Sequence, residues 1–397
     1  MLAIVAPGQG SQTPGFLKPW LEIPSFATRL EWLSAVAALD LGHYGTEADA
    51  ETIRDTAIAQ PLLVSAGLLA ALELFPTPTD GFGKVGVAAG HSVGEITVAA
   101  GAGVISAEAA MVFVRERGRA MATASAARPT SMTAIIAGDR DEVLAAIEAQ
   151  GLTPANNNGA GQIVAAGTVE QLEALAANPP ARARLVPLSV AGAFHTVHME
   201  PAVDRLRHLS KAISTRDART RLLSNADGQV VHDGREYLRR LVDQVANPVR
   251  WDLCMDTMRE LGVTGLLELP PAGTLTGIAK RNLKGIGLFS LNTPDQLDEA
   301  RAFVADHAEA DQTDMSTSPT WRLLVSPRKG SFRRASGVEE GAFLAPGAEL
   351  GQVVNLREAV SVVAPHGGQV TEWLVEDNDP VSPGQPLVRL HPHAEES

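Results

Sequence analysis

Cysteine is almost absent from this sequence of 397 residues, because Cys254 is the single one. A lone cysteine has no partner for an internal disulfide bond, and it cannot supply the several thiolates of a cysteine-based zinc site. The sequence therefore predicts a fold without disulfide cross-links, and neither a metal ion nor a cofactor is expected.

Positive charge is also in deficit. The 33 lysine and arginine residues face 46 aspartate and glutamate residues, and the formal net charge is −13. Proteins that bind nucleic acid neutralise its phosphates with a basic face, so nucleic acid is not predicted as the main partner. The chain also has no uninterrupted stretch of 18 apolar residues and no basic segment followed by an apolar run near its start. We therefore expect no membrane span, no signal peptide and a cytoplasmic location.

Charge and composition change near residue 295, which predicts a domain boundary. Residues 295–320 include seven acidic residues and a single basic residue, Arg301, and from about Ala308 the chain is polar. Such a segment cannot bury enough apolar surface to fold by itself. We therefore predict a first domain at 1–294, an acidic helix and linker at 295–320, and a second domain at 321–392.

The first domain alternates short runs of β-forming residues with Ala- and Leu-rich helical segments. The predicted strands lie at 2–6, 84–90, 132–138, 162–167, 184–190, 220–228 and 263–270. This alternation predicts an α/β protein with a mostly parallel sheet. The compact run of strands and helices at about 127–191 predicts a small inserted subdomain.

The segment Gly90-His91-Ser92-Val93-Gly94 lies between a predicted strand and a predicted helix. This is the setting of a nucleophile elbow, in which a sharp turn presents a serine hydroxyl at the end of a strand. The N-terminus of the following helix places main-chain N–H groups near a developing oxyanion, and the N–H of Val93 is one candidate donor.

A serine nucleophile needs a base, and the sequence offers ten histidines. His91 adjoins Ser92, but neighbouring side chains on such a turn diverge, which favours a structural role. His195 follows an apolar strand, at a strand end where α/β sheets present functional groups. The residues alone do not separate His195 from His198.

Several further motifs accompany the elbow in a fixed order along the chain. They are Gly8-Gln9-Gly10-Ser11-Gln12, the extended elbow Gly90–Glu95, Arg117-Gly118, Ala193–Met199 and Gln244 before Asn247-Pro248. With these motifs, residues 1–294 resemble the malonyl-CoA:acyl-carrier-protein transacylases. The resemblance implies an α/β-hydrolase-like core and a smaller, ferredoxin-like lobe that closes over the acyl site. It also implies malonyl-CoA and an acyl carrier protein as partners, in fatty acid or polyketide synthesis.

The resemblance assigns catalytic roles to five positions. Ser92 would carry the malonyl group as an ester, and His195 would act as its base. Gln244 would orient His195 through its carbonyl, while Gln9 and the N–H of Val93 would form the oxyanion hole.

Three further positions concern the acyl group. Arg117 would hold the malonyl carboxylate, which fits a planar guanidinium that matches both oxygens and stays protonated. Without the resemblance, Arg117 would be read as a surface residue beside Arg115 and Arg119. Phe194 would crowd an α-methyl branch and favour malonyl over methylmalonyl, and Met121 is a second specificity position.

After Trp321 short predicted strands alternate with Gly/Pro turns, which is typical of a small all-β module. The spacing of its glycines resembles the barrel-sandwich fold of biotinyl and lipoyl carrier domains. The lysine that would receive the cofactor falls at Arg357, whose guanidinium cannot form the amide. Lys329 is the single lysine after the linker and lies in the opening segment. The module therefore resembles a carrier domain that has lost its chemistry.

Two other functions remain open from the sequence. A thioester hydrolase would need an acidic residue in the role of Gln244, and a noncatalytic scaffold would use the β module as its interaction face. Lys280-Arg281 and Lys284 are candidates for docking an acidic carrier protein, although a solvated helix face explains them equally well.

Overall fold

The chain folds into two compact units, Met1–Ala310 and Asp311–Ser397, in a computed structural model. The residues that the structure describes are 1–75, 77, 81, 83–159, 161–190, 192–308, 322–355, 358–365 and 367–391. Arg357 and residues 309–320 of the predicted helix and linker segment lie outside them.

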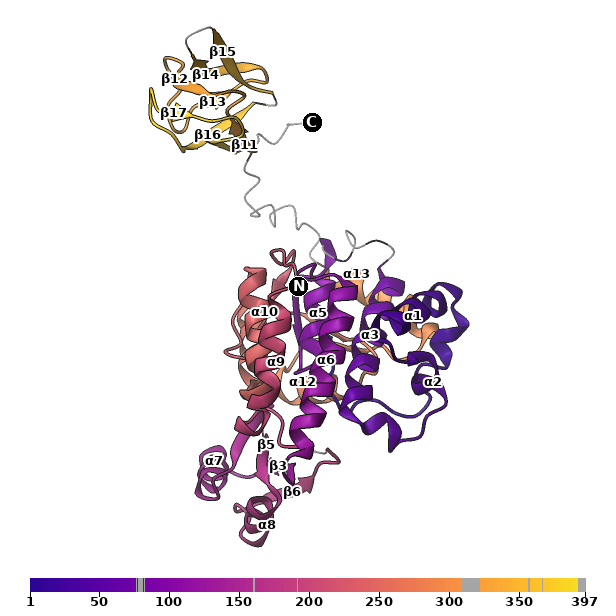
Figure 1. Cartoon of the computed structure of the whole chain (residues 1–397). Coiled ribbons are helices and arrows are strands. Elements are labelled where there is room, and N and C mark those ends of the chain that lie inside the picture. Colours follow the sequence, from indigo (N-terminus) through magenta and orange to yellow (C-terminus); the bar gives the residue numbers. More distant parts are fainter. Residues whose placement is uncertain are drawn as a thin grey trace. The chain divides into compact units, whose positions relative to one another are not determined.

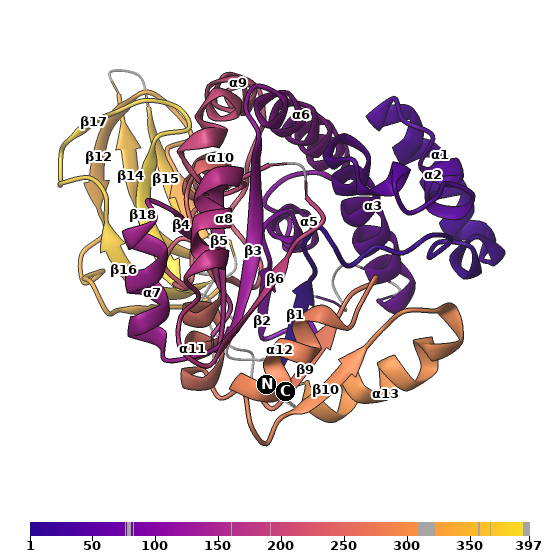
Figure 2. The ribbon, with the colours of Figure 1, turned by 90° about the horizontal axis from the view of Figure 1, so that it is seen from below.

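The first unit, whose helices are labelled in Figure 1, is built on a parallel sheet with strand order β10-β9-β1-β2-β7 (Figure 2). These strands are β1 (Leu2–Ala6), β2 (Val87–Gly90), β7 (Arg221–Leu222), β9 (Gly265–Glu268) and β10 (Gly287–Ser290). Every residue of β1, β2 and β9 is buried, as expected for parallel strands that helices cover on both faces. Their short apolar runs made these strands recognisable in the sequence.

Helices pack on both faces of this sheet. Their bounds are α1 (Pro24–Ala37), α2 (Leu41–Thr46), α3 (Thr56–Leu74), α5 (Gly94–Gly101), α6 (Ala107–Ala126), α9 (Glu200–Ser210), α10 (Gly234–Asp243), α11 (Trp251–Glu260), α12 (Thr274–Asn282) and α13 (Leu297–His307). Alternate residues of β1 join different core clusters: Ile4 lies with α3, α5 and α6, and Val5 lies with α11 and α12. Figure 2 shows α5 between the sheet and the α3–α6 pair.

Two helices differ from simple expectations. By length and composition α3 could cross a membrane, with a mean hydropathy of 1.7, but 72% of that window is buried inside the unit, as in a core helix. Helix α13 belongs to the first unit, although the sequence analysis placed it beyond residue 294. Its apolar residues Leu297, Ala300 and Val304 are buried in the main core, which holds the helix there despite its acidic surface.

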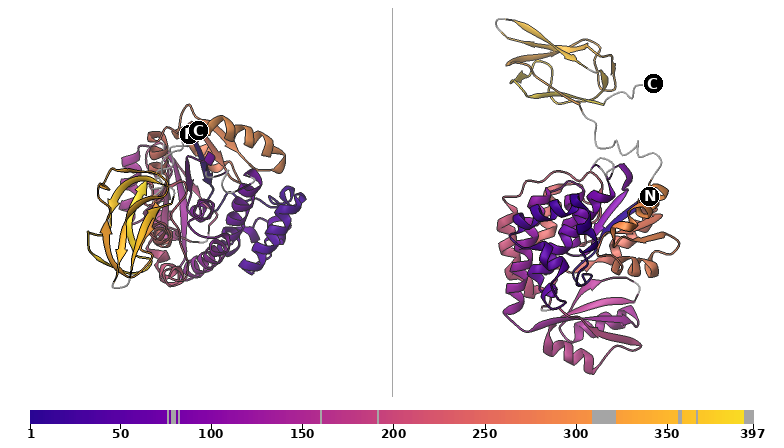
Figure 3. Two further views of the ribbon diagram at one scale, coloured as in Figure 1. Left: turned by 90° about the horizontal axis from the view of Figure 1, so that it is seen from above. Right: turned by 90° about the vertical axis from the view of Figure 1, so that its right-hand side faces the viewer.

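A smaller lobe is inserted in the first unit after α6. Its sheet has the order β6-β3-β5-β4-β8, and it is antiparallel except where β4 pairs with β8. The lobe comprises β3 (Thr130–Ala137), α7 (Arg140–Ala149), β4 (Thr153–Asn157), β5 (Gln162–Thr168), α8 (Val169–Ala177) and β6 (Ala183–Pro187), with β8 (Val249–Arg250) from the main body. The magenta ribbon of Figure 3 shows it at one end of the unit. Strand β4 has the sequence Thr-Pro-Ala-Asn-Asn, which is poor in β-forming residues, and the sequence analysis missed it.

The second unit contains two antiparallel four-stranded sheets, ordered β11-β18-β16-β13 and β15-β14-β12-β17. Its strands are β11 (Arg322–Val325), β12 (Gly330–Arg334), β13 (Phe343–Leu344), β14 (Ala348–Val354), β15 (Ala359–Ala364), β16 (Gly368–Trp373), β17 (Pro380–Val381) and β18 (Pro386–His391). Phe332, Leu350 and Leu387 are fully buried in its separate core. The unit thus has its own hydrophobic interior.

Candidate active site

Ser92 lies on a sharp turn between β2 and α5, and its φ of 54° is in the left-handed region. The flanking glycines permit this turn. A Cβ on Gly90 would lie 2.0 Å from the carbonyl carbon of Gly94, and a Cβ on Gly94 would lie 2.2 Å from the carbonyl oxygen of Ala6. The predicted strand–turn–helix geometry around Ser92 is present.

Asn225, in the loop after β7, holds the turn in place. Its Oδ1 accepts a hydrogen bond from the main-chain N–H of Ser92 at 2.8 Å, and its Nδ2 donates to the carbonyl oxygen of Gly90 at 2.8 Å. Asn225 is fully buried. The sequence analysis did not select it; a polar Ser-Asn-Ala-Asp-Gly segment directly after an apolar strand was the available signal.

His195 is the histidine that the fold brings to the serine. Its Nε2 lies 2.7 Å from Ser92 Oγ, and its Nδ1 lies 2.8 Å from the main-chain oxygen of Gln244. His91 instead contacts Asn158 and the ring of Trp251. Burial, with the nearby Arg117 guanidinium as the next cause, lowers the pKa of His195 to about 3. A neutral imidazole is the form that can accept a proton from Ser92.

Arg117 on α6 is fully buried, whereas its neighbours Arg115 and Arg119 pair with Glu116 near the surface. Its Nη1 donates to Gln60 Oε1 at 2.7 Å. Its Nη2 donates to Gln244 Oε1 at 2.8 Å and lies 3.3 Å from Ser92 Oγ. Burial lowers the pKa of Arg117 to about 10, so the guanidinium still carries its charge at neutral pH. A buried cation therefore lies within reach of an acyl group on Ser92.

Glu95, in the first turn of α5, contacts the side chain of Gln244 and is only 1% exposed. Its carboxyl accepts hydrogen bonds from the main-chain N–H of Asn225 at 2.6 Å and from Nε2 of Gln244. Burial raises the pKa of Glu95 to about 8, and its hydrogen bonds and Arg117 oppose the rise. No role for Glu95 was predicted from the sequence, in which an acid within an apolar helix was the available signal.

Gln9 lies at the site, but its side chain is engaged elsewhere. Its Nε2 donates to the carbonyl oxygen of Arg54 and to Thr56 Oγ1, both at 3.2 Å, and Gln60 Nε2 lies 3.5 Å from its Oε1. Its side-chain N–H groups are therefore directed to these partners rather than to Ser92. Val93 is buried at the start of α5, directly after Ser92.

Phe194 and Met121, the two predicted specificity positions, are both buried in the main core. Met121 lies one turn after Arg117 on α6, and its sulfur accepts a hydrogen bond from Gln60 Nε2 at 3.4 Å. Gln60 thus contacts both the predicted carboxylate-binding arginine and a predicted specificity residue, and sequence reasoning missed it.

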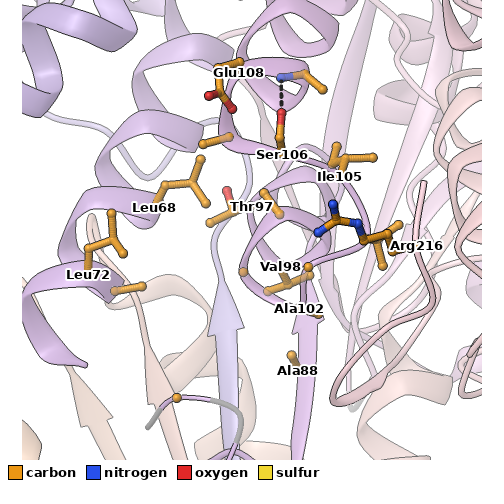
Figure 4. Close-up of a pocket in the computed structure, with 18 of the residues that line it drawn as sticks. Leu68, Leu72, Ala88, Thr97, Val98, Ala102, Ile105, Ser106, Glu108 and Arg216 are labelled. Carbon is orange, nitrogen blue, oxygen red and sulfur yellow. Dashed lines mark hydrogen bonds between the residues drawn. The ribbon is translucent and has the colours of Figure 1, made fainter. Parts of the chain in front are cut away.

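A cavity of about 970 Å³ lies towards the other end of α5, between α3 and the start of α6 (Figure 4). Leu68, Leu72, Val98 and Ile105 contribute to its mostly apolar lining. None of the predicted site residues lines it. The cavity is therefore separate from the cluster around Ser92.

Comparison with known proteins gives consistent matches for the first unit. The family described as the acyl transferase domain matches residues 4–323. The malonyl CoA-acyl carrier protein transacylases of Mycobacterium tuberculosis (strain ATCC 25618 / H37Rv) and Mycobacterium bovis are each 50% identical over 299 residues, which cover 75% of this chain and 99% of the relative. The Escherichia coli (strain K12) transacylase is 32% identical over 303 residues, covering 74% of this chain and 97% of its own.

Solved structures agree with these sequence matches. The crystal structure of MCAT from Mycobacterium tuberculosis has a TM-score of 0.73 at 49% identity, covering 76% of this chain and 99% of its own. A malonyl-transacylase solved in complex with a type II PKS acyl-carrier protein has a TM-score of 0.69 at 31% identity, with the same coverage of 76% and 99%. About a quarter of this chain lies outside each match.

Proposed function

This chain belongs to the malonyl-CoA:acyl-carrier-protein transacylase family of acyl transferases, and we propose that it moves malonyl groups from malonyl-CoA to the thiol of an acyl carrier protein for fatty acid synthesis. The observation that carries the proposal is the pairing of Ser92 and His195 with a buried guanidinium. Ser92 Oγ lies 2.7 Å from His195 Nε2 and 3.3 Å from Arg117 Nη2. This arrangement suits an acyl group that ends in a carboxylate.

In the first half-reaction Ser92 Oγ attacks the thioester carbonyl carbon while His195 Nε2 takes the serine proton. The C–S bond then breaks, the leaving sulfur of CoA receives the proton from His195, and the malonyl group remains on Ser92 as an ester. The hydrogen bond from His195 Nδ1 to the carbonyl oxygen of Gln244 fixes the tautomer in which Nε2 is free to accept.

The tetrahedral intermediate carries its charge on the former carbonyl oxygen. The main-chain N–H of Val93, at the start of α5, is one donor for this oxyanion, because helix N-termini present N–H groups to negative charge. The side chain of Gln9 is bonded to Arg54 and Thr56, so we assign its contribution to the main-chain N–H.

In the second half-reaction the thiol of the acyl carrier protein loses its proton to His195 and attacks the ester carbon. The bond from the carbonyl carbon to Ser92 Oγ breaks, and Ser92 recovers the proton from His195. Arg117 holds the malonyl carboxylate in both halves by a charge-assisted contact. Phe194 and Met121 shape the space beside the acyl group and disfavour a methyl branch.

A thioester hydrolase is less well supported. Enzymes that activate water commonly place a carboxylate behind the histidine, as in the Ser-His-Asp triad. Here the described partner of His195 Nδ1 is a neutral main-chain carbonyl, which stabilises an imidazolium less. That difference favours transfer to a thiol, which is the stronger nucleophile.

Intact mass spectrometry after incubation with malonyl-CoA tests the proposal. We expect a stable mass increase of one malonyl group on the wild-type chain and none on Ser92→Ala. His195→Ala should acquire the label orders of magnitude more slowly. Rapid release of free malonate would indicate a hydrolase, and the absence of any label would indicate a noncatalytic scaffold.

For the finer architecture, the proposal is an α/β-hydrolase-like core, a ferredoxin-like small lobe and a barrel-sandwich second unit. The second unit is proposed as a noncatalytic docking module for another protein, since two β-sheets enclose a core of its own and the transacylase motifs lie before it. The cytoplasmic location remains a prediction from the sequence.

A further inference from the structure

Glu95 makes contacts that the catalytic steps above do not explain. A buried carboxyl is costly unless donors compensate it, and the donors to Glu95 include the main-chain N–H of Asn225, Nε2 of Gln244 and the hydroxyl of Tyr237. Gln244 in turn bonds the guanidinium of Arg117. A continuous chain of hydrogen bonds therefore joins Glu95 to the predicted carboxylate-binding residue.

The amide of Gln244 has one orientation that satisfies its surroundings. Its Nε2 faces acceptors: Glu95 Oε2, the main-chain oxygen of Ser92 at 3.2 Å and Asn225 Oδ1 at 3.4 Å. Its Oε1 faces Arg117 Nη2 at 2.8 Å. If the amide of Gln244 were reversed, its oxygen would face these acceptors and its NH₂ would face the guanidinium of Arg117. Both pairs would then lack a hydrogen bond. When it is ionised, above its pKa of about 8, Glu95 is the charged acceptor among the three and therefore the main determinant of the orientation.

We propose that Glu95 is a positioning residue for malonyl transfer, which fixes the amide of Gln244 so that Gln244 holds Arg117 beside Ser92. The inference rests on the proposed function and deepens it. With Gln60 on Nη1 and Gln244 on Nη2, the guanidinium is held at both ends of its fork before substrate arrives. Such preorganisation lowers the cost of binding the malonyl carboxylate, whereas an acetyl group gains nothing from it.

Glu95→Gln tests this relay, the hydrogen-bond chain from Glu95 through Gln244 to Arg117, with almost no change in side-chain volume. One oxygen becomes NH₂, and it cannot face the main-chain N–H of Asn225, which is a fixed donor. The new NH₂ must therefore face Gln244, whose amide reverses and turns its own NH₂ towards Arg117. At pH 9, where Glu95 of the wild type is ionised, we expect the ratio of malonyl to acetyl kcat/KM to fall about tenfold, with acetyl transfer nearly unchanged.

Glu268→Gln is the matched control. Glu268 is also a fully buried glutamate, and it accepts hydrogen bonds from the main-chain N–H groups of Gly273, Leu275 and Thr276 at the start of α12. It should lower stability without changing the malonyl-to-acetyl ratio. A second test uses the Arg117→Ala background, in which Glu95→Gln should cause no further fall in the ratio.

Each outcome decides the inference. An unchanged ratio in Glu95→Gln, or equal losses of malonyl and acetyl transfer, would reduce Glu95 to a structural residue. If Glu95→Gln does not fold, Gln244→Met decides, because it removes the amide and keeps the main-chain carbonyl that His195 uses; an unchanged ratio there overturns the relay. A wild-type chain that never acquires a malonyl label would instead defeat the proposed function.

Discussion

At the residue scale, the site depends on the different environments of similar side chains. Arg115, Arg117 and Arg119 follow one another on α6, yet only Arg117 is buried among polar partners of the site. Similarly, His195 meets Ser92 while His198 lies partly exposed on the next turn. Position in the fold, more than residue type, distinguishes these side chains from one another.

Replacing Arg117 should change acyl selectivity. In Arg117→Ala the malonyl carboxylate would lose a charge-assisted contact, typically ~1.5–3 kcal/mol, so the malonyl-to-acetyl ratio should fall roughly tenfold to a hundredfold. Steady-state transfer from both CoA thioesters measures the ratio. Arg119→Ala is the control, since that side chain is half exposed and pairs with Glu116. A ratio that stays at the wild-type value would place Arg117 outside the acyl site.

The depressed pKa of His195 predicts an unusual pH profile. An ordinary histidine of pKa about 6.5 would be only ~3% neutral at pH 5, whereas His195, at about 3, stays neutral. The rate of Ser92 acylation should therefore show no loss from histidine protonation between pH 7 and 5. In Arg117→Ala the pKa of His195 should rise, because one of the causes that lower it is removed. The loss of the acylation rate in acid should therefore begin nearer to neutral pH. Rapid-quench acylation rates across pH measure both.

The same depression affects stability in acid. The unfolded chain binds a proton on His195 near pH 6.5, and the folded chain does so near pH 3. Above pH 6.5 His195 is neutral in both states and does not lower the free energy of unfolding. Between pH 6.5 and 3 only the unfolded chain binds the proton, so the free energy of unfolding falls as the pH falls through this range. A His195→Gln variant should lose less stability than the wild type over this window, as measured by denaturant unfolding.

At the element scale, the elbow needs two close approaches that only glycine allows. Strand β2 turns into α5 within four residues, and α5 packs directly on β1 and β2. Asn225 then ties the turn to the end of β7. The position of Ser92 Oγ is thus fixed by backbone packing from three strands.

Two glycines of α5 provide a matched test. Gly94→Ala places a Cβ 2.2 Å from the carbonyl oxygen of Ala6, so the helix must shift, at a cost of ~1–3 kcal/mol in unfolding free energy and with slower acylation. Gly101→Ala, at the other end of the same helix, meets nothing within 4 Å and should be neutral or stabilise by up to ~1 kcal/mol. Equal effects of the two substitutions would contradict this account of the elbow.

At the scale of the whole molecule, the two units have separate hydrophobic cores. The matched relatives are covered almost completely while about a quarter of this chain lies outside each match. Helix α13 closes the first unit with buried apolar residues, so a cut before it would expose part of the main core.

A truncation after Ala310 should therefore keep its fold and transfer malonyl groups to a free acyl carrier protein within a few-fold of the full chain. Cutting after Leu291 instead should destabilise the unit by removing α13, and serves as the contrasting variant. A folded Ala310 truncation without transfer activity would show that the second unit takes part in the chemistry. Biotin or lipoate on the full chain, detected by mass spectrometry, would contradict the prediction that the second unit is unmodified.

Features that depend on neighbours along the chain could be predicted from the amino-acid sequence. Apolar runs marked the buried strands, the glycines around Ser92 marked the elbow, and Gly/Pro turns marked the β unit. Strand β4 was missed because its residues are poor in β-forming types, and pairing with β5 and β8 makes it a strand. The motifs together also indicated the family, because their order is more specific than any one of them.

Features that join residues far apart in the sequence emerge only from tertiary packing. His195 and Ser92 are 103 residues apart, Arg117 and Gln244 are 127 apart, and Glu95 and Gln244 are 149 apart. Burial, amide orientation and the lowered pKa of His195 arise only when these segments pack together, since each depends on the solvent and charges that neighbouring elements exclude or supply. Glu95, Asn225 and Gln60 thus acquire their partners from packing, although local patterns made Glu95 and Asn225 noticeable in the sequence.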